Sequence, residues 1–107
     1  MRERRQNKLT DEFRDLIAKF LEIESDRKSV ITVTRVELLS EGKLLRAYLS
    51  VFPIDQEKVV LGFAERRTGE ARKYLASKTK MRSVPKIEFV LDQGEKNRQR
   101  IDELLRK

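Results

Sequence analysis

The sequence predicts an α+β domain in which a three-stranded sheet carries its helices on one face. Two observations lead to this prediction. Apolar residues recur at helical spacing in some stretches and at alternate positions in others, in the order helix, strand, strand, helix, helix, strand. The chain has 107 residues, a length that suits one modest core. We therefore expect a single domain over residues 1–107, with a basic arm at 1–8 and a tail helix at 94–107.

The first helix is predicted from Thr10 to Glu24, although the pattern also allows a start a few residues earlier. Thr10 fits an N-cap, and the acidic residues Asp11 and Glu12 suit the positive end of the helix dipole. The apolar stripe of this helix consists of Leu9, Phe13, Leu16, Ile17, Phe20 and Leu21.

A β-hairpin is predicted next. The stretch Val30–Leu39 is rich in Val, Ile and Thr, which favour strands. A turn at residues 40–43 contains Gly42, and from Leu45 to Phe52 apolar and polar residues alternate. This alternation indicates a second strand with one buried face, which Pro53 ends.

The second half of the chain predicts two consecutive helices and a third strand. A helix covers Gln56–Arg67, and Gly69 interrupts the helical pattern before a further helical run from Ala71 to Thr79. Pro85 ends this run, and Ile87–Leu91 alternates as a strand. In the tail helix, the apolar residues Ile101, Leu104 and Leu105 are expected to dock on the body of the domain.

Composition excludes several classes of function. The chain has neither Cys nor His, so thiolate metal sites, disulfides and the commonest general base are missing. No apolar run approaches the roughly 20 residues of a membrane span. We expect a cytoplasmic, non-enzymatic protein without metal, cofactor or small-molecule substrate. The net charge of +7 favours a polyanion, with nucleic acid as the first candidate and an anionic membrane surface as the second.

The positive charge is concentrated in two segments. The segment from Glu65 to Arg82 contains seven basic residues and two acidic ones. The break at Gly69 should expose backbone N–H groups at the start of a helix. Such a helix start beside cations can bind phosphate. The candidate nucleic-acid-binding residues are Arg66, Arg67, Thr68, Gly69, Arg72, Lys73, Lys78, Lys80 and Arg82, with Arg4, Arg5 and Lys8 from the arm. The alternative is an ordinary solvated helix face, and charge alone does not separate RNA from DNA.

Two aromatic residues, Tyr48 and Phe52, fall on the strand face opposite Leu49 and Val51. They could stack on bases. The alternative is that they pack at the sheet edge or under the tail helix, and the sequence leaves both interpretations open.

Four segments resemble the ribosome-binding factor A family, bacterial assembly factors of the small ribosomal subunit with a type II KH-like fold. They are Val-Thr-Arg-Val-Glu at 33–37, Gly-Glu-Ala-Arg-Lys-Tyr-Leu-Ala at 69–76, Met-Arg-Ser-Val-Pro-Lys-Ile-Glu-Phe-Val-Leu-Asp at 81–92, and Arg-Ile-x-x-Leu-Leu at 100–105. The third segment is similar at every spacing to the family pattern Leu-Arg-x-x-Pro-x-Leu-x-Phe-x-x-Asp.

The resemblance implies a variant of the KH site. KH domains hold the nucleic-acid backbone with a Gly-x-x-Gly loop, which this family replaces with an Ala-x-Gly kink between two helices. Here the kink would be Arg67-Thr68-Gly69. Arg67 stands where the family has Ala, so this chain adds a cation at the kink.

The resemblance also implies a function. Members of the family bind the free small subunit, assist late maturation of its RNA and support processing of the 16S rRNA ends. They act near the 5′-terminal helix of that RNA and leave before the subunits join. A monomer is expected. The alternatives are a basic RNA-binding module unrelated to the ribosome, a protein-interaction module whose acidic helix from Asp11 docks on a basic partner, and a DNA-binding domain.

Overall fold

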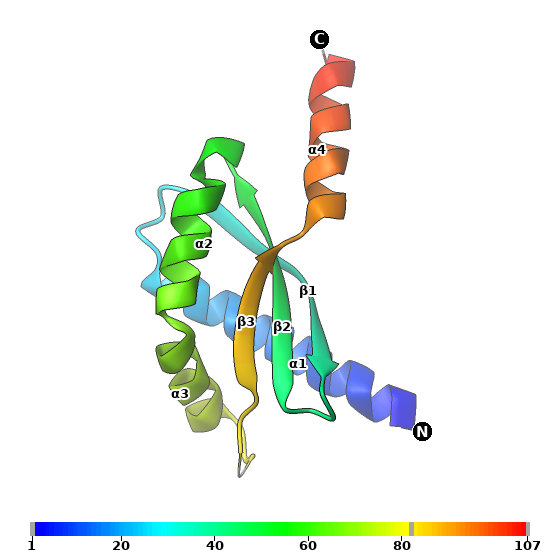
Figure 1. Ribbon diagram of the computed structural model, residues 1–107, viewed down its shortest axis with the longest axis vertical. Coiled ribbons are helices and arrows are strands. Elements are labelled where there is room, and N and C mark those ends of the chain that lie inside the picture. The colour runs from blue at the N-terminus through cyan, green and yellow to red at the C-terminus, as the bar shows by residue number, and fades with distance from the viewer. Residues whose placement is uncertain (1, 82, 107) are drawn as a thin grey trace.

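The computed structural model describes the backbone of residues 2–81 and 83–106, and their side chains except at 2–7, 95, 96, 99 and 106. Along the chain the elements are α1 (Arg2–Glu24), β1 (Val30–Leu39), β2 (Leu44–Phe52), the 3-10 turn η1 (Ile54–Gln56), α2 (Glu57–Arg66), α3 (Thr68–Lys78), β3 (Lys86–Leu91) and α4 (Gln93–Arg106). The predicted α+β order of helices and strands is confirmed (Figure 1).

The strands form one sheet in the order β1-β2-β3. β1 and β2 pair antiparallel as the predicted hairpin, whereas β3 runs parallel to β2. A parallel neighbour requires the chain to return from the end of β2 to its beginning. The helices α2 and α3 make this return along the β3 side of the sheet (Figure 1).

A β-bulge sets the register of β1. Val33 pairs with Leu49, but the next pair along the strands is Arg35 with Tyr48, so Thr34 is an extra residue. Without the extra residue the side chains after it would turn to the opposite face of the sheet, because side-chain direction alternates along a strand. The Thr34 hydroxyl donates to Asp92 Oδ2 at 2.6 Å.

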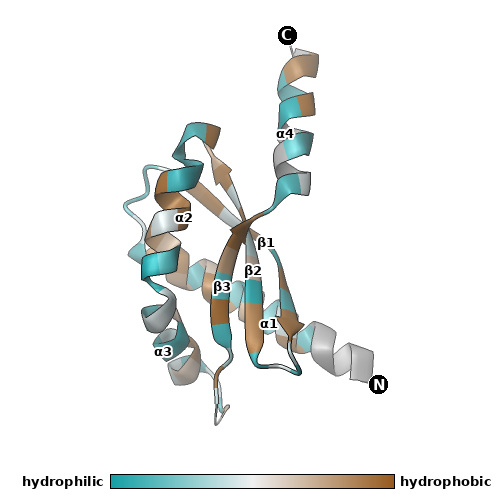
Figure 2. Ribbon diagram, in the orientation of Figure 1, coloured by the Kyte–Doolittle hydropathy of each residue, from teal (hydrophilic) through white to brown (hydrophobic). Residues whose placement is uncertain are grey.

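The core lies between one face of the sheet and helices α1, α2 and α3. α1 crosses behind the sheet in Figure 1, and the apolar positions of the strands and helices are brown in Figure 2. The core contains Phe13, Ile17, Phe20, Leu21, Val33, Leu45, Ala47, Leu49, Ala64, Ala71, Leu75, Val84, Ile87 and Phe89. Among the described residues no polar or charged side chain is fully buried. The prediction of helices on one face is confirmed.

α1 begins much earlier than predicted. It starts at Arg2, so the expected N-terminal arm is helical and Thr10 lies inside the helix rather than at its N-cap. The first residues of the chain include Arg, Glu, Gln and Lys, which are good helix formers, and contain no Gly or Pro that would stop the helix. Leu9 packs against the core and extends the apolar stripe.

The break between α2 and α3 also differs from the prediction. The helix is interrupted at Arg67, whose φ and ψ are −109° and 11°, and Gly69 lies in the first turn of α3. Only this residue separates the two helices, so the chain turns a corner rather than forming a loop. The predicted break was therefore placed two residues too late.

The prediction that the tail helix docks on the body of the domain is wrong. α4 projects away from the sheet in Figure 1, and Ile101, Leu104 and Leu105 are 57%, 71% and 79% exposed. Asp92 is the one residue between β3 and α4, and its N–H donates to the Leu49 carbonyl at 2.8 Å. The chain therefore has no loop in which to fold back over the sheet.

The contact between Thr34 and Asp92 predicts a measurable stability effect. Thr34→Val keeps the shape and strand preference of the side chain but removes the donor to Asp92. We expect the free energy of unfolding to fall by about 1–2 kcal/mol, because the carboxylate loses a hydrogen bond in a partly buried position. Chemical denaturation measures this change. Thr32→Val is the matched control, since Thr32 is exposed on the same strand, and an equal loss in both variants would contradict the prediction.

Candidate nucleic-acid interface

The corner between α2 and α3 presents the N-terminus of a helix at the surface. The Arg67 N–H donates to the Ala64 carbonyl at 3.0 Å and ends α2, while the Arg67 carbonyl accepts from Ala71 N–H at 2.9 Å and begins α3. The first N–H groups of a helix lack intrahelical acceptors and carry its positive partial charge. Gly69 lies in this first turn, and no heavy atom lies within 4 Å of the position that a Cβ would occupy there. The backbone is therefore open to an approaching anion.

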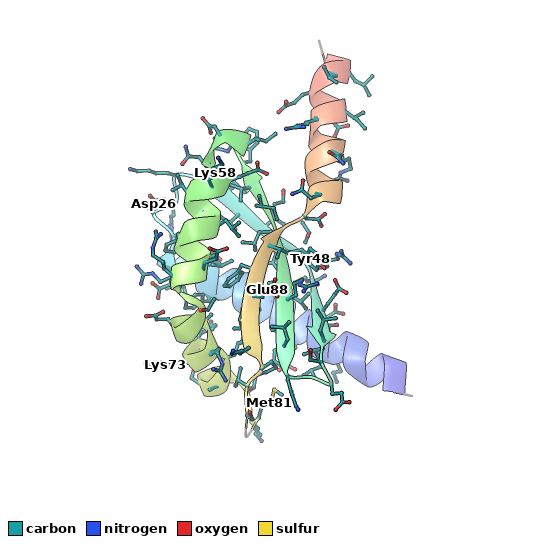
Figure 3. All side chains as sticks on the ribbon, viewed as in Figure 1. Asp26, Tyr48, Lys58, Lys73, Met81 and Glu88 are labelled. Carbon is teal, nitrogen blue, oxygen red and sulfur yellow. The ribbon has the colours of Figure 1, made fainter. Side chains whose placement is uncertain are left out.

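A basic groove adjoins this helix start. It has a volume of about 470 Å³ and is lined by Gly69, Arg72, Lys73, Ala76, Met81, Ser83 and Val84. We call it the Gly69 groove; Figure 3 labels Lys73 and Met81 beside it. The Arg72 Nη2 donates to the Val84 carbonyl at 3.0 Å, which holds this guanidinium across the groove. Lys73 is exposed.

Other predicted residues lie on a different face of the helices. Arg67 Nη1 is 3.6 Å from Glu24 Oε2 at the end of α1, and the guanidinium lies 5.4 Å from the Phe63 ring. Lys78 Nζ lies 5.7 Å from the ring of Tyr74. Because a helix turns by 3.6 residues, consecutive basic residues of a segment point in different directions. The cation that Arg67 was expected to add at the kink is paired with Glu24 on α1 in this structure, and the phosphate clamp stays a prediction.

The remaining predicted residues are scattered or lie outside the described part of the chain. Arg66 lines a pocket on another side of α2, and Lys80 is exposed beyond the end of α3. Lys8 is exposed on α1, whose N-terminal end extends past β1 and away from α3 in Figure 1. Arg82 and the side chains of Arg4 and Arg5 lie outside the described residues.

A second groove, which sequence reasoning missed, runs between α2 and the edge strand β3. Its volume is also about 470 Å³, and it is lined by Leu61, Glu65, Thr68, Ile87, Glu88, Phe89, Val90, Leu91 and Gln93. The lining includes two carboxylates and no cation, so this groove is a poorer phosphate site than the Gly69 groove. Its existence depends on β3 lying at the sheet edge, for which the sequence carries no local signal.

Two arginines on the open face of the sheet have partners within the sheet. The Arg35 guanidinium lies 3.9 Å from the centre of the Tyr48 ring, and Arg46 Nε is 3.5 Å from Glu88 Oε2. A hydrogen bond with Tyr48 and the negative charge of Glu88 raise the pKa of Arg46 above its ordinary value. The Arg35 guanidinium therefore lies over the Tyr48 ring, whereas Phe52 is 58% exposed.

Two other classes of site find no support in the described residues. They contain no cluster of three or more acidic, His or Cys side chains that could hold a metal ion. None of the described helices combines the length and apolar character that crossing a membrane requires.

Comparison with known proteins points to one family. A family model described as ribosome-binding factor A matches residues 5–105. A ribosome-binding factor A from Thermobifida fusca is 34% identical over 106 residues, covering 96% of this chain and 70% of the relative.

Solved structures show the same fold. The crystal structure of ribosome-binding factor A from Thermus thermophilus is similar with a TM-score of 0.73, at 24% identity, over 80% of this chain and 93% of that one. A homology model of the Thermus thermophilus factor, fitted into a cryo-EM map of its complex with the 30S subunit, has a TM-score of 0.67 at 22% identity, over 78% of this chain and 91% of that one. The KH-like fold expected from the sequence is confirmed.

The open position of Gly69 predicts opposite effects on stability and binding. In Gly69→Ala the free energy of unfolding should rise by about 0.5–1 kcal/mol, because Ala is the better helix former and its methyl meets no atom. If phosphate contacts this backbone, the same methyl should weaken binding of a short RNA. Denaturation and RNA titration measure the two effects.

Gly42→Ala is the matched contrast for the stability effect. Gly42 has φ +83°, a left-handed conformation that costs an Ala about 1–2 kcal/mol, so this variant should be less stable. Unchanged RNA affinity in Gly69→Ala would place the phosphate contact elsewhere.

Proposed function

Because the chain belongs to the ribosome-binding factor A family, we propose that it binds the free small ribosomal subunit through 16S rRNA and assists late maturation of that subunit, including processing of the rRNA ends. The contacted RNA lies near the 5′-terminal helix, as the sequence resemblance implies. A structural relative, the Thermus thermophilus factor, has been fitted into a map of a 30S complex, which supports this proposal. The protein acts as one RNA-binding domain over residues 1–107, as a monomer and in the cytoplasm.

The Gly69 groove is the observation that supports a contact with RNA. The RNA backbone lies across the first turn of α3, where a phosphate accepts hydrogen bonds from free N–H groups. Gly69 leaves room for this approach. Arg72 is already held by its bond to the Val84 carbonyl and loses little conformational entropy on binding. Lys73 adds charge at the groove, and Lys80 adds charge just beyond the end of α3. These charges strengthen attraction to RNA without selecting a sequence.

We infer that the protein acts by binding rather than by catalysis. In the described part of the chain no polar or charged side chain is fully buried. Nucleophiles and general bases are usually activated by burial and by a partner group. The chain also lacks His and Cys.

A charge reversal at the groove tests the RNA contact. Arg67 and Arg72 contact other parts of the fold, and Lys78 lies over the Tyr74 ring on α3, so reversing these three charges would mix folding with binding. The exposed pair Lys73→Glu and Lys80→Glu avoids this problem. We expect affinity for purified small subunits to fall at least about tenfold, and the slope of log affinity against log salt to fall by roughly 0.7–0.9 for each lost phosphate contact.

The control for this experiment is the pair Lys19→Glu and Lys58→Glu, because both side chains are exposed, neither lines the groove, and the pair makes the same change of charge. Affinity should remain near that of the unchanged protein. An equal loss in both variants would mean that the total charge matters and not the groove.

A second candidate function is docking on a basic protein through α1. Asp11, Glu12 and Asp15 are exposed along this helix, and Arg14 lies 3.9 Å and 3.6 Å from the carboxylates of Asp11 and Asp15. This face is acidic in an otherwise basic chain, so it would attract basic ribosomal proteins rather than RNA.

Nuclease treatment separates the two functions. If rRNA is the contact, limited RNase digestion of subunit particles should release the bound protein into the supernatant, as measured by sedimentation. Retention on the digested particles, together with binding to purified ribosomal proteins, would instead support the acidic helix. The variants Asp11→Asn and Glu12→Gln should then weaken binding, and they should leave it unchanged if RNA is the contact.

A further inference from the structure

A pocket separate from both grooves lies between the end of α1, the loop that follows it, and α2. Its volume is about 270 Å³. We call it the Phe63 pocket, and its apolar lining consists of Ile31, Val59, Val60 and Phe63. It lies on a different face of α2 from the groove along β3, which Leu61 and Glu65 line. The lining of the Gly69 groove shares no residue with it.

One wall of the pocket carries a cation. Val59, Phe63 and Arg66 follow one another at helical spacing on α2, and all three line the pocket. Arg66 Nη1 is 3.4 Å from the position that a Cβ would take at Gly62, so the guanidinium lies back along the helix. Within the described part of the chain this guanidinium forms no ion pair.

The opposite wall carries an anion held by the loop. Asp26 Oδ1 accepts from the Lys28 N–H at 3.0 Å, and Ser25 Oγ accepts from the Arg27 N–H at 3.1 Å. Figure 3 labels Asp26 in this loop beside α2. The second carboxylate oxygen, Oδ2, has no described partner. The neighbouring Glu24 is already paired with Arg67 at 3.6 Å.

These walls define the chemistry of a ligand. The apolar floor suits a flat ring, the carboxylate accepts hydrogen bonds and donates none, and the guanidinium binds a phosphate or stacks on a ring. The volume is just below the range of about 300–1,000 Å³ usual for small-molecule sites, so it suits one base rather than a larger group. A nucleotide supplies a ring, donors at one edge and a phosphate at the other.

Guanine fits the anionic wall better than the other bases. Its N1–H and N2–H₂ groups are neighbouring donors that a carboxylate can engage together, whereas the donor edges of adenine and cytosine each offer one amino group. Uracil places two carbonyl oxygens beside its single N–H, and these oxygens repel a carboxylate. A basic peptide would leave Arg66 facing a like charge, and the net charge of +7 favours a polyanion over it.

We propose that the Phe63 pocket binds one unstacked guanine of a single-stranded RNA segment, with Asp26 accepting from its donor edge and Arg66 contacting its phosphate or ring. The inference rests on the proposed function, because the RNA that carries this guanine is the rRNA of the small subunit. The pocket would add selection of a base to the sequence-independent binding of the RNA backbone at the Gly69 groove.

The test uses the full isotope-labelled chain and the four nucleoside 5′-monophosphates as probes. We expect 5′-GMP to shift the methyl resonances of Ile31, Val59 and Val60 saturably, with affinity roughly tenfold higher than for 5′-UMP. Asp26→Asn should reduce this preference to near parity, and Arg66→Gln should weaken binding of all four nucleotides. Asp11→Asn and Lys58→Gln, which remove the same charges on α1 and α2 outside the pocket, should change neither result.

Three outcomes would overturn the inference. One is the absence of methyl shifts with any nucleotide, and another is equal affinity for all four that Asp26→Asn leaves unchanged. The third is that the peptide acetyl-Lys-Leu-Lys-amide binds more tightly than GMP and shifts the same methyl resonances, which would indicate that the pocket binds a protein partner. Small-subunit binding distinguishes failure of the pocket inference from failure of the proposed function. If the protein binds subunits, Lys73→Glu weakens that binding, and GMP does not bind, only the pocket inference fails. If the unchanged protein does not bind subunits, the proposed function fails.

Discussion

The parallel pairing of β3 with β2 is the constraint on which the rest of the structure depends. It obliges the chain to travel back along the sheet between the end of β2 and the start of β3, and α2 and α3 make this return. Because both helices must keep an apolar face on the sheet, the corner between them is reduced to Arg67, with Ala64 and Ala71 buried on either side. The corner turns the first N–H groups of α3 toward the surface. The proposed phosphate site is thus a consequence of the crossover rather than an addition to it.

The same two helices divide the basic segment among three surfaces. Arg72 and Lys73 line the Gly69 groove, Arg67 pairs with Glu24 on α1, and Arg66 lies in the Phe63 pocket. The side chain at each position makes a different kind of interaction. The groove offers charge to a phosphate backbone without selecting a sequence, the ion pair with α1 ties the corner to the first helix, and the pocket places a guanidinium opposite a carboxylate. A count of cations in the segment would treat these side chains as equivalent.

The bulge at Thr34 connects the hairpin to the end of the third strand. It restores the register after Val33, and the same residue bonds to Asp92, where β3 ends and α4 begins. With β3 ended there and no loop after it, α4 leaves the sheet at once and its apolar side chains stay exposed (Figure 1). On the open face, Arg35 covers Tyr48 and Arg46 pairs with Glu88. Arg35 and Arg46 on that face thus have described partners within the sheet, in contrast to the exposed Lys73 of the groove on α3.

The sequence by itself determined the order of the elements, the strands and the family. β1 spans Val30–Leu39 as its Val, Ile and Thr content predicted. β2 begins one residue earlier than predicted, because the period of two marks a half-buried strand directly. It also located the basic segment that contains the Gly69 groove. It misplaced the start of α1 and the break at Arg67, and it did not show the parallel pairing, the groove along β3, or the surfaces reached by Arg66 and Arg67. Local periodicity states which face of an element is buried, but not which neighbour covers it. Where a charged side chain ends up depends on that neighbour, and only the tertiary structure decided it.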